Sequence, residues 1–320
     1  MATIVEARNL KKYFQIERGL LRKTAGFIKA VDAIDLTIKK AEIMGLVGES
    51  GCGKTTVGKL LLNLIKPDEG EVRIGGVDIS EKHADIDLKK KAQIIFQDPY
   101  GSLNPRMKVE DIILEGIDIF KLYTGKERNK RLRRLLDIVG LAFSAKNKYP
   151  HQFSGGERQR IGIARALSVE PEFIICDEPV SSLDVSIRAQ VLNLLKDLQE
   201  EFALSYLFIS HDLNVVRYIS DRIAVMYKGK IVEKAESGKL YYEPLHPYTK
   251  YLLSANLSAE PKQRFKKLAY EATEKDVADE GKGCIFYPLC PVSRNICQEI
   301  NPSFEEVEPY HYVACHLYNR

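Results

Sequence analysis

A chain of 320 residues exceeds the usual size of a single domain, so we expect one large domain with a smaller appendage. Hydrophobic residues make up 45% and charged residues 29%, a globular composition that excludes a disordered chain. The net charge of +4, from 48 basic and 44 acidic side chains, is too balanced for a protein that coats nucleic acid, and we expect no nucleic-acid partner.

The start of the chain alternates apolar and polar side chains over residues 3–8 and 31–38, which predicts half-buried antiparallel strands. Residues 17–28 lie between them and mix basic and apolar side chains around two glycines, so we expect an exposed hairpin or loop there. Residues 1–6 lack the pattern of a signal peptide, and no apolar run is long enough to span a bilayer. We therefore expect a soluble protein of the cytoplasm.

A glycine-rich loop follows the apolar run at residues 43–47 and precedes a leucine-rich helix, which is the setting of a phosphate-binding P-loop. Glycines let backbone N–H groups converge on phosphate oxygens, Lys54 brings a positive charge, and the Thr55 hydroxyl can ligate Mg²⁺. A glycine-rich turn arising by chance is the alternative, and the strand and helix in register argue against it. The nucleotide-binding residues we predict are Gly48, Glu49, Ser50, Gly51, Cys52, Gly53, Lys54, Thr55 and Thr56.

Further short apolar runs, at residues 92–96, 173–176 and 206–209, are typical of strands buried in a parallel sheet. Periodic segments between and after them indicate helices, so the sequence predicts an α/β core. Residues 98–160 read as mostly helical and are expected to form a helical subdomain.

A second helix start carries two glycines, Gly155 and Gly156, between Ser154 as a helix cap and Glu157. Such a start can bind an anion, although an ordinary helix entry is the commoner meaning of this pattern. One ATPase domain rarely needs two phosphate-binding helix starts. We therefore expect this one to meet nucleotide held by another copy.

Two adjacent carboxylates, Asp177 and Glu178, end the apolar run at residues 173–176 and so reach the carboxyl edge of the sheet. We expect Asp177 to hold Mg²⁺ or its water shell and Glu178 to polarise the water that attacks the γ-phosphate. A solvated acidic turn is the alternative, which the P-loop upstream disfavours.

The segment after residue 240 changes character, and we divide the chain into an ATPase domain at 1–240 and a C-terminal extension at 241–320. Its cysteines lack the close pairs usual in zinc sites, so we favour a [4Fe–4S] cluster, with Zn²⁺, disulfides or free thiols as alternatives. The four candidate ligands are Cys284, Cys290, Cys297 and Cys315.

In content and order, the P-loop, Gln97, the Ser154 segment, Asp177 with Glu178, Asp184 and His211 resemble the ABC ATPase family over about residues 4–255. The resemblance implies a RecA-like P-loop core with an antiparallel β subdomain and a helical subdomain. It also implies that Gln97 contacts Mg²⁺ and the membrane partner, that Asp184 touches the opposite subunit, and that His211 contacts the γ-phosphate. An aromatic residue stacks on adenine in this family; Phe14 is favoured over Tyr13. The family's commonest signature has Leu and Gln where this chain has Phe153 and Glu157.

Three stretches, at residues 96–105, 149–154 and 244–249, resemble the ATPase subunits of dipeptide and oligopeptide importers. The 17–28 insertion is similar to that of the second of two paired ATPases. This implies a heterodimer with a homologous ATPase, two transmembrane permease subunits, an extracytoplasmic peptide-binding protein, and a place on the cytoplasmic face of the membrane. An importer ATPase for a sugar or metal chelate, or a soluble ABC ATPase, is the alternative.

Overall fold

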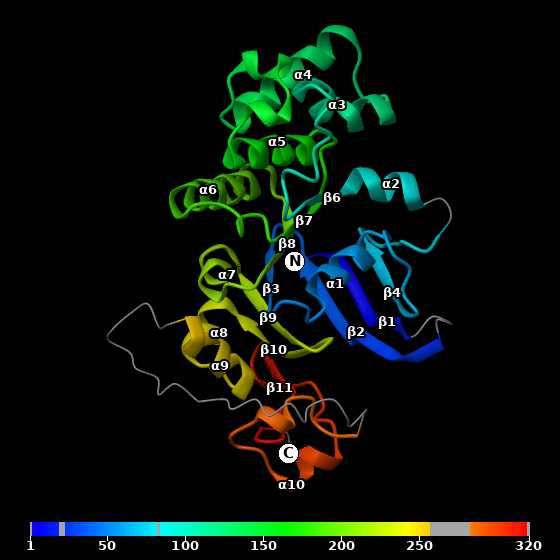
Figure 1. The fold of residues 1–320 in the computed structure, drawn as a ribbon, viewed down its shortest axis with the longest axis vertical. Helices are drawn as coiled ribbons and strands as arrows, with labels where there is room; N and C mark the ends of the chain where they lie inside the picture. Colours follow the sequence, from blue (N-terminus) through cyan, green and yellow to red (C-terminus); the bar gives the residue numbers. More distant parts are fainter. Residues whose placement is uncertain (1, 19–22, 82–83, 257–281, 319–320) are drawn as a thin grey trace.

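The computed structural model describes residues 2–18, 23–81, 84–256 and 282–318, shown in Figure 1. Within that part of the chain, no helix is both long and apolar enough to span a bilayer. The strands are β1 (Thr3–Arg18), β2 (Lys23–Lys39), β3 (Ile43–Val47), β4 (Glu69–Ile74), β5 (Val77–Asp78), β6 (Ala92–Ile95), β7 (Phe173–Asp177), β8 (Ser205–Ser210), β9 (Arg222–Tyr227), β10 (Lys230–Glu236), β11 (Glu305–Glu308) and β12 (His311–Val313). The helices are α1 (Lys54–Leu61), α2 (Ala84–Lys91), α3 (Val109–Phe120), α4 (Gly125–Ile138), η1 (Phe143–Asn147), η2 (Pro150–Gln152), α5 (Gly155–Leu167), α6 (Val185–Phe202), α7 (Leu213–Ile219), α8 (Ser237–Tyr242), α9 (Pro247–Asn256), η4 (Tyr287–Leu289) and α10 (Asn295–Glu299).

The main sheet has the strand order β11-β12-β10-β9-β3-β8-β7-β6, and the five strands from β9 to β6 pair in parallel. Alternate residues of β3 enter two different cores: Ile43 and Val47 pack with the helical side, and Met44 and Leu46 pack with α1 and the antiparallel sheet. Both faces of the sheet are therefore covered, which explains why its inner strands β3, β7 and β8 are buried at every position and mostly apolar. The predicted α/β core is confirmed.

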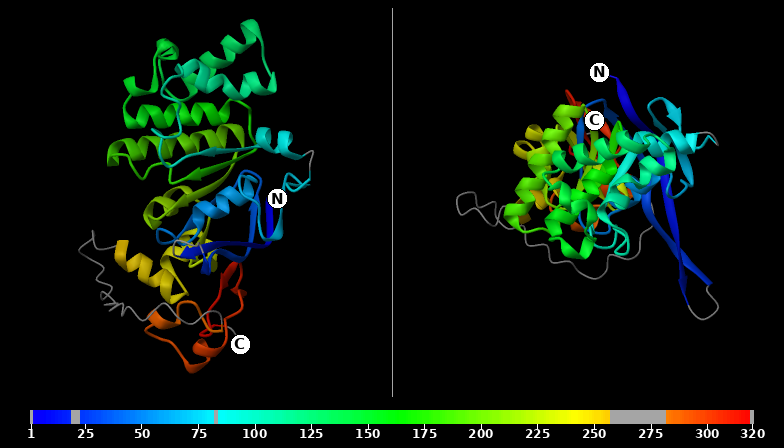
Figure 2. Two further views of the ribbon diagram at one scale, coloured as in Figure 1. Left: turned by 45° about the vertical axis from the view of Figure 1, so that its right-hand side comes forward. Right: turned by 90° about the horizontal axis from the view of Figure 1, so that it is seen from above.

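A second, antiparallel sheet has the order β2-β1-β4-β5. The two predicted strands are much longer than the alternating patterns at 3–8 and 31–38, because the pairing of β1 with β2 continues to Arg18 and Lys23. Most of the predicted exposed hairpin at 17–28 is therefore the outer end of this ribbon, which projects away from the body in the right-hand view of Figure 2. Its residues 19–22 lie outside the described residues.

The helical subdomain stands above the main sheet in Figure 1 and comprises α3, α4, η1, η2 and the start of α5. Its core consists of the apolar positions at helical spacing that the sequence suggests, and these side chains are at most 2% exposed. They are Val109, Ile112, Ile113, Ile117, Leu132, Leu135 and Leu136.

The expected fold also includes a small Cys-rich C-terminal domain in the extension at 241–320, and the structure does not support such a separate unit. Strand β12 pairs with β10, and β11 pairs with β12, so the segment lengthens the main sheet. The Phe286 ring is 2% exposed and packs within 5.3 Å of the Tyr227 ring of β9. An edge strand leaves backbone groups unpaired, and pairing β10 with the tail satisfies them. The domain boundary near residue 240 stays a prediction.

One buried histidine makes stability depend on pH. His246 is 1% exposed, and burial lowers its pKa to about 4, against about 6.5 when unfolded. Between these two pKa values the unfolded chain binds a proton at His246 that the folded chain does not bind. The contribution of His246 to the free energy of unfolding is therefore present above pH 6.5 and is lost as the pH falls toward 4. Replacing His246 by Asn, which keeps an acceptor for the Tyr248 N–H, should remove about 2 kcal/mol of the pH dependence between pH 7 and 5. Urea unfolding of both proteins at these pH values measures it; equal pH dependence would contradict the assignment.

Candidate functional site

The glycine-rich loop joins β3 to α1 and holds Lys54 at the start of that helix. Lys54 is 5% exposed, and its Nζ donates to the carbonyl oxygens of Gly48 at 2.7 Å and Glu49 at 2.8 Å. Gly53 has φ +111°, and a Cβ there would lie 1.9 Å from the Ala30 carbonyl oxygen. Only glycine fits at position 53, so the loop can wrap closely around the buried ammonium group of Lys54.

A hydroxyl and a carboxylate lie next to this loop. Thr55 Oγ1 donates to Asp177 Oδ1 at 3.1 Å, which links α1 to the carboxyl end of β7. Asp177 is 6% exposed; burial first, and then the charge of Glu178, raise its pKa. Two hard oxygen donors beside a phosphate-type loop suit Mg²⁺, which takes few ligands from the protein and the rest from phosphate and water.

Glu178 follows β7 with φ 45°, and its N–H donates to the Ile209 carbonyl oxygen at 3.0 Å. Its Oε2 accepts a hydrogen bond from Gln97 Nε2 at 2.8 Å and lies 3.2 Å from His211 Nδ1. These three side chains come from the ends of the neighbouring parallel strands β6, β7 and β8, which meet at one edge of the sheet.

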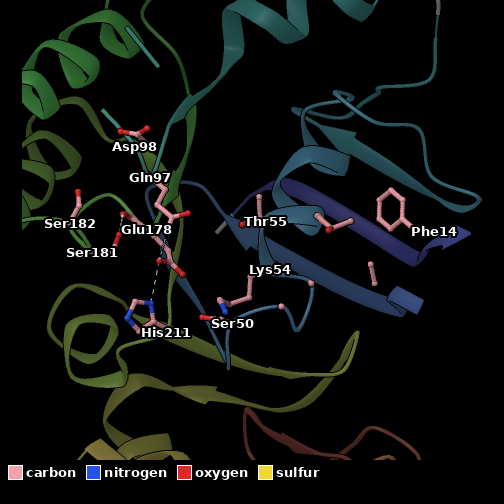
Figure 3. A pocket seen from close by; sticks show the side chains of 14 residues that line it. Phe14, Ser50, Lys54, Thr55, Gln97, Asp98, Glu178, Ser181, Ser182 and His211 are labelled. Carbon is pink, nitrogen blue, oxygen red and sulfur yellow. Dashed lines mark hydrogen bonds and ion pairs between the residues drawn. The ribbon is translucent and has the colours of Figure 1, made fainter. Parts of the chain in front are cut away.

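The loop and the Glu178 group face one cavity of about 780 Å³. Figure 3 shows Phe14 on one side of it, Glu178 and His211 on the other, and Lys54 and Thr55 between them. Tyr13, the alternative to Phe14, does not line the cavity, and its hydroxyl donates to Asp32 instead. The predicted residues that line it are Phe14, Ser50, Gly51, Gly53, Lys54, Thr55, Thr56, Gln97, Glu178 and His211.

Four lining residues were not predicted as site residues from the sequence, although Ser182 begins the motif that ends at Asp184; they are Ala30, Asp98, Ser181 and Ser182. Asp98 directly follows Gln97, and the two serines lie a few residues after Glu178, so proximity to a predicted residue was the available signal. Ala30 belongs to β2 and approaches the loop only through folding, for which the sequence carries no local sign.

The second glycine-bearing helix start lies elsewhere. Ser154 caps α5: its Oγ accepts from the Glu157 N–H at 3.3 Å, and the Ser154 N–H donates to Glu157 Oε2 at 2.8 Å. Glu157, which departs from the family's commonest residue, therefore completes a capping box. Asp184 occupies the N-cap position of α6 without a side-chain cap bond. None of Ser154, Gly155, Gly156, Glu157 or Asp184 lines the cavity, so one chain presents the two helix starts apart.

Burial raises the pKa of the Cys315 thiol to about 11, and the charges of Cys284, Cys290 and Cys297 add to the rise. The Cys284 N–H donates to the Cys297 carbonyl oxygen at 2.7 Å. Yet among the described residues no group of three or more His, Cys, Asp or Glu side chains is placed to hold a metal ion. The conformation described here therefore does not fit the predicted cluster or the zinc alternative.

The cavity thus combines a buried lysine at a helix start, a threonine hydroxyl bonded to the buried Asp177 carboxylate behind it, an exposed aromatic ring and a carboxylate held by an amide and an imidazole. Such a set can bind a nucleoside triphosphate with a divalent cation and direct water at its terminal phosphate.

Comparisons with known proteins support this chemistry. The family model described as "ABC transporter" matches residues 31–181, and "Oligopeptide/dipeptide transporter, C-terminal region" matches residues 232–297. The oligopeptide transport ATP-binding protein AppF of Bacillus subtilis is 50% identical over 322 residues, covering 99% of this chain and 98% of that protein. The oligopeptide transport ATP-binding protein OppF of Bacillus subtilis is 48% identical, and the match covers 98% of this chain and 96% of that protein. The dimeric ATP-binding cassette MJ0796, in a post-hydrolysis state bound to ADP and Pi, has a TM-score of 0.65 and 29% identity, covering 73% of this chain and 99% of that one.

Proposed function

The chain belongs to the oligopeptide transport ATP-binding proteins of the ABC transporter family, and we propose that it binds and hydrolyses ATP to drive peptide import across a membrane. The observation that carries the proposal is the single cavity that joins the loop around Lys54 to the Glu178 group. Full-length identity of 50% to a protein named for oligopeptide transport supports the peptide substrate. Peptide uptake by the assembled importer is the test.

The loop residues and Lys54 would bind the phosphates of ATP, and Phe14, which is 41% exposed on the cavity wall, would stack on the adenine. Thr55, Asp177 and Gln97 would hold Mg²⁺. When bound, that cation neutralises charge that develops on the phosphate oxygens. The hydroxyl–carboxylate contact at 3.1 Å supports this assignment, because it already places two hard oxygens together beside the loop.

Glu178 would accept the proton of the attacking water. Its carboxylate is fixed from two sides by Gln97 and His211, so its orientation in the cavity is set before substrate arrives. His211 would in turn sense the γ-phosphate, because its imidazole lines the same cavity. Gln97 donates a hydrogen bond directly to the Glu178 carboxylate, so a shift of the loop that carries Gln97 would move Glu178 out of position. This agrees with the expected role of that loop in sensing the membrane partner.

The nucleotide site would be completed by a second ATPase subunit that contributes the helix start at Ser154, Gly155, Gly156 and Glu157, together with Asp184. The absence of these residues from the cavity of one chain supports a shared site. So does the dimeric state of MJ0796. We propose a homologous partner, so that the functional unit is a heterodimer.

As a peripheral subunit of a membrane transporter, the chain works with transmembrane permease subunits. We propose two of them, together with an extracytoplasmic peptide-binding protein, and a position on the cytoplasmic face of the membrane, where ATP is supplied.

We propose the [4Fe–4S] cluster of the four-cysteine tail as a prediction from the sequence alone, because no three of the described side chains are placed together as metal ligands. Anaerobically purified protein should then contain about four iron atoms per chain and a visible charge-transfer band that bleaches on oxidation. Replacing Cys297 by Ser should remove the iron, whereas replacing Cys176, a fully buried thiol in β7, should not. Wild-type protein without iron would overturn the prediction, and zinc in its place would establish the alternative.

A further inference from the structure

A tyrosine far along the chain touches the phosphate-binding loop. The Tyr248 hydroxyl accepts a hydrogen bond from the Glu49 N–H at 3.0 Å, although the two residues are 199 positions apart. Tyr248 lies in α9 and is 1% exposed, whereas Glu49 is exposed, so this contact is partly buried. A partly buried hydrogen bond holds its donor group more firmly than a fully exposed one.

The contact acts on the same peptide units that orient Lys54. Lys54 Nζ donates to the carbonyl oxygens of Gly48 and Glu49, while Tyr248 binds the Glu49 N–H, which belongs to the peptide group containing the Gly48 carbonyl. That peptide group is therefore held at both ends, by a lysine at its oxygen and a tyrosine at its nitrogen. If the tyrosine hydroxyl is lost, the peptide can rotate, and the lysine that it supports moves with it.

Two aromatic rings from distant parts of the chain fix Tyr248 in place. Its ring lies 4.5 Å from that of Tyr227 in β9 and 5.5 Å from that of Phe286, which belongs to the four-cysteine segment. The Phe286 ring is 2% exposed and also packs on Tyr227 at 5.3 Å. Such edge and tilted contacts set ring positions within narrow limits.

The polar contacts of this region also converge on the tail. The Tyr248 N–H donates to His246 Nδ1 at 3.0 Å, and the His246 N–H donates to Glu233 Oε2 at 2.9 Å. Glu233 is fully buried, and its Oε1 lies 2.7 Å from His311 Nε2 in β12. The start of α9 is therefore tied to the C-terminal strand as well as to the loop.

We propose that Tyr248 is a positioning residue for ATP binding, and that Tyr248, Tyr227 and Phe286 couple the packing of the C-terminal segment to the phosphate-binding loop. Loosening the segment around Phe286 then weakens ATP binding without touching the nucleotide. The inference rests on the proposed function only in taking ATP as the ligand.

The first test replaces Tyr248 by Phe, which removes the hydroxyl and keeps the ring. The matched control is Tyr206→Phe, because the buried Tyr206 hydroxyl has no hydrogen-bond partner among the described residues. Tyr248→Phe should raise the KM for ATP about five-fold, the effect of one lost hydrogen bond, and change kcat less than about two-fold. Tyr206→Phe should change neither. An unchanged KM in a folded Tyr248→Phe protein would overturn the proposal.

The second test concerns the coupling. Phe286→Leu should raise the KM for ATP in the wild-type background but add little in the Tyr248→Phe background, because both changes act through the same hydroxyl. Independent, additive effects would overturn the coupling. If Tyr248→Phe fails to fold, hydrogen exchange decides: the Glu49 amide should exchange faster in Phe286→Leu than in wild type, and equal rates would contradict the proposal.

Failure of the inference and failure of the proposed function give different results. If wild type and Tyr206→Phe do not bind ATP, the proposed function fails. If both bind ATP and Tyr248→Phe binds it equally well, only the role of Tyr248 fails.

Discussion

Replacing Glu178 by Gln abolishes ATP turnover and leaves ATP binding intact. The amide keeps the size of the side chain and can still contact Gln97 and His211, but it cannot accept a proton from water. General-base catalysis contributes roughly 10²- to 10⁴-fold, so kcat should fall by that order. Because Glu178 does not belong to the loop around Lys54, the dissociation constant for ATP should stay within about two-fold of the wild-type value.

Phosphate release and equilibrium binding of ATP, measured on the same preparations, check this result. Glu172→Gln is the matched control, since Glu172 is an exposed carboxylate just before β7, and its exposed contact with Lys40 lies outside the cavity. The control should hydrolyse ATP at the wild-type rate. Full turnover by Glu178→Gln would remove this residue from the mechanism.

Replacing Lys54 by Ala should abolish ATP binding itself. The change removes a nearly buried positive charge from the phosphate site and both hydrogen bonds that brace the Gly48 and Glu49 carbonyls. Charge-assisted hydrogen bonds are the strong ones, so affinity for ATP should fall on the order of 100-fold or more. Turnover falls with it, in contrast to Glu178→Gln, which separates the two steps.

Isothermal titration with ATP and Mg²⁺ measures the loss. Lys59→Ala provides the control, because Lys59 lies on the same helix α1, carries the same charge, is exposed and is not among the residues that line the cavity. Circular dichroism of all three proteins excludes unfolding as the cause. Tight ATP binding by Lys54→Ala would contradict the assignment of the loop.

Most of the fold could be predicted from patterns within short stretches of the sequence. Strands β3, β7 and β8 are buried on both faces, so each is a continuous apolar run that stands out in the sequence. The glycine positions of the loop are equally local: Gly53 needs a left-handed backbone and has no room for a Cβ. Gln97, Glu178 and His211 follow consecutive members of one parallel sheet, so their meeting at its edge could be expected.

Contacts between distant segments could not be predicted from such local patterns. The pairing of Glu233 with Val313 and the bond from Glu49 to Tyr248 depend on how the chain closes, and neither leaves a periodic pattern. The tail therefore looked like a separate unit, although its strands extend the main sheet. The β1–β2 ribbon was underestimated for a related reason: its outer end lacks a buried face, with Phe27 and Ile28 more than half exposed, so strict alternation is not required there.

This chain supplies the energy for peptide import, and transport by the assembled importer is the decisive measurement. The chain is combined with its second ATPase, the permease subunits in vesicles and the peptide-binding protein, and uptake of a labelled oligopeptide is followed. Peptide should accumulate in the vesicles only when ATP is present, and the accumulation should be lost when Glu178→Gln replaces the wild-type chain. Equal uptake with the two proteins, or ATP-driven uptake of a sugar or metal chelate but not of peptide, would contradict it.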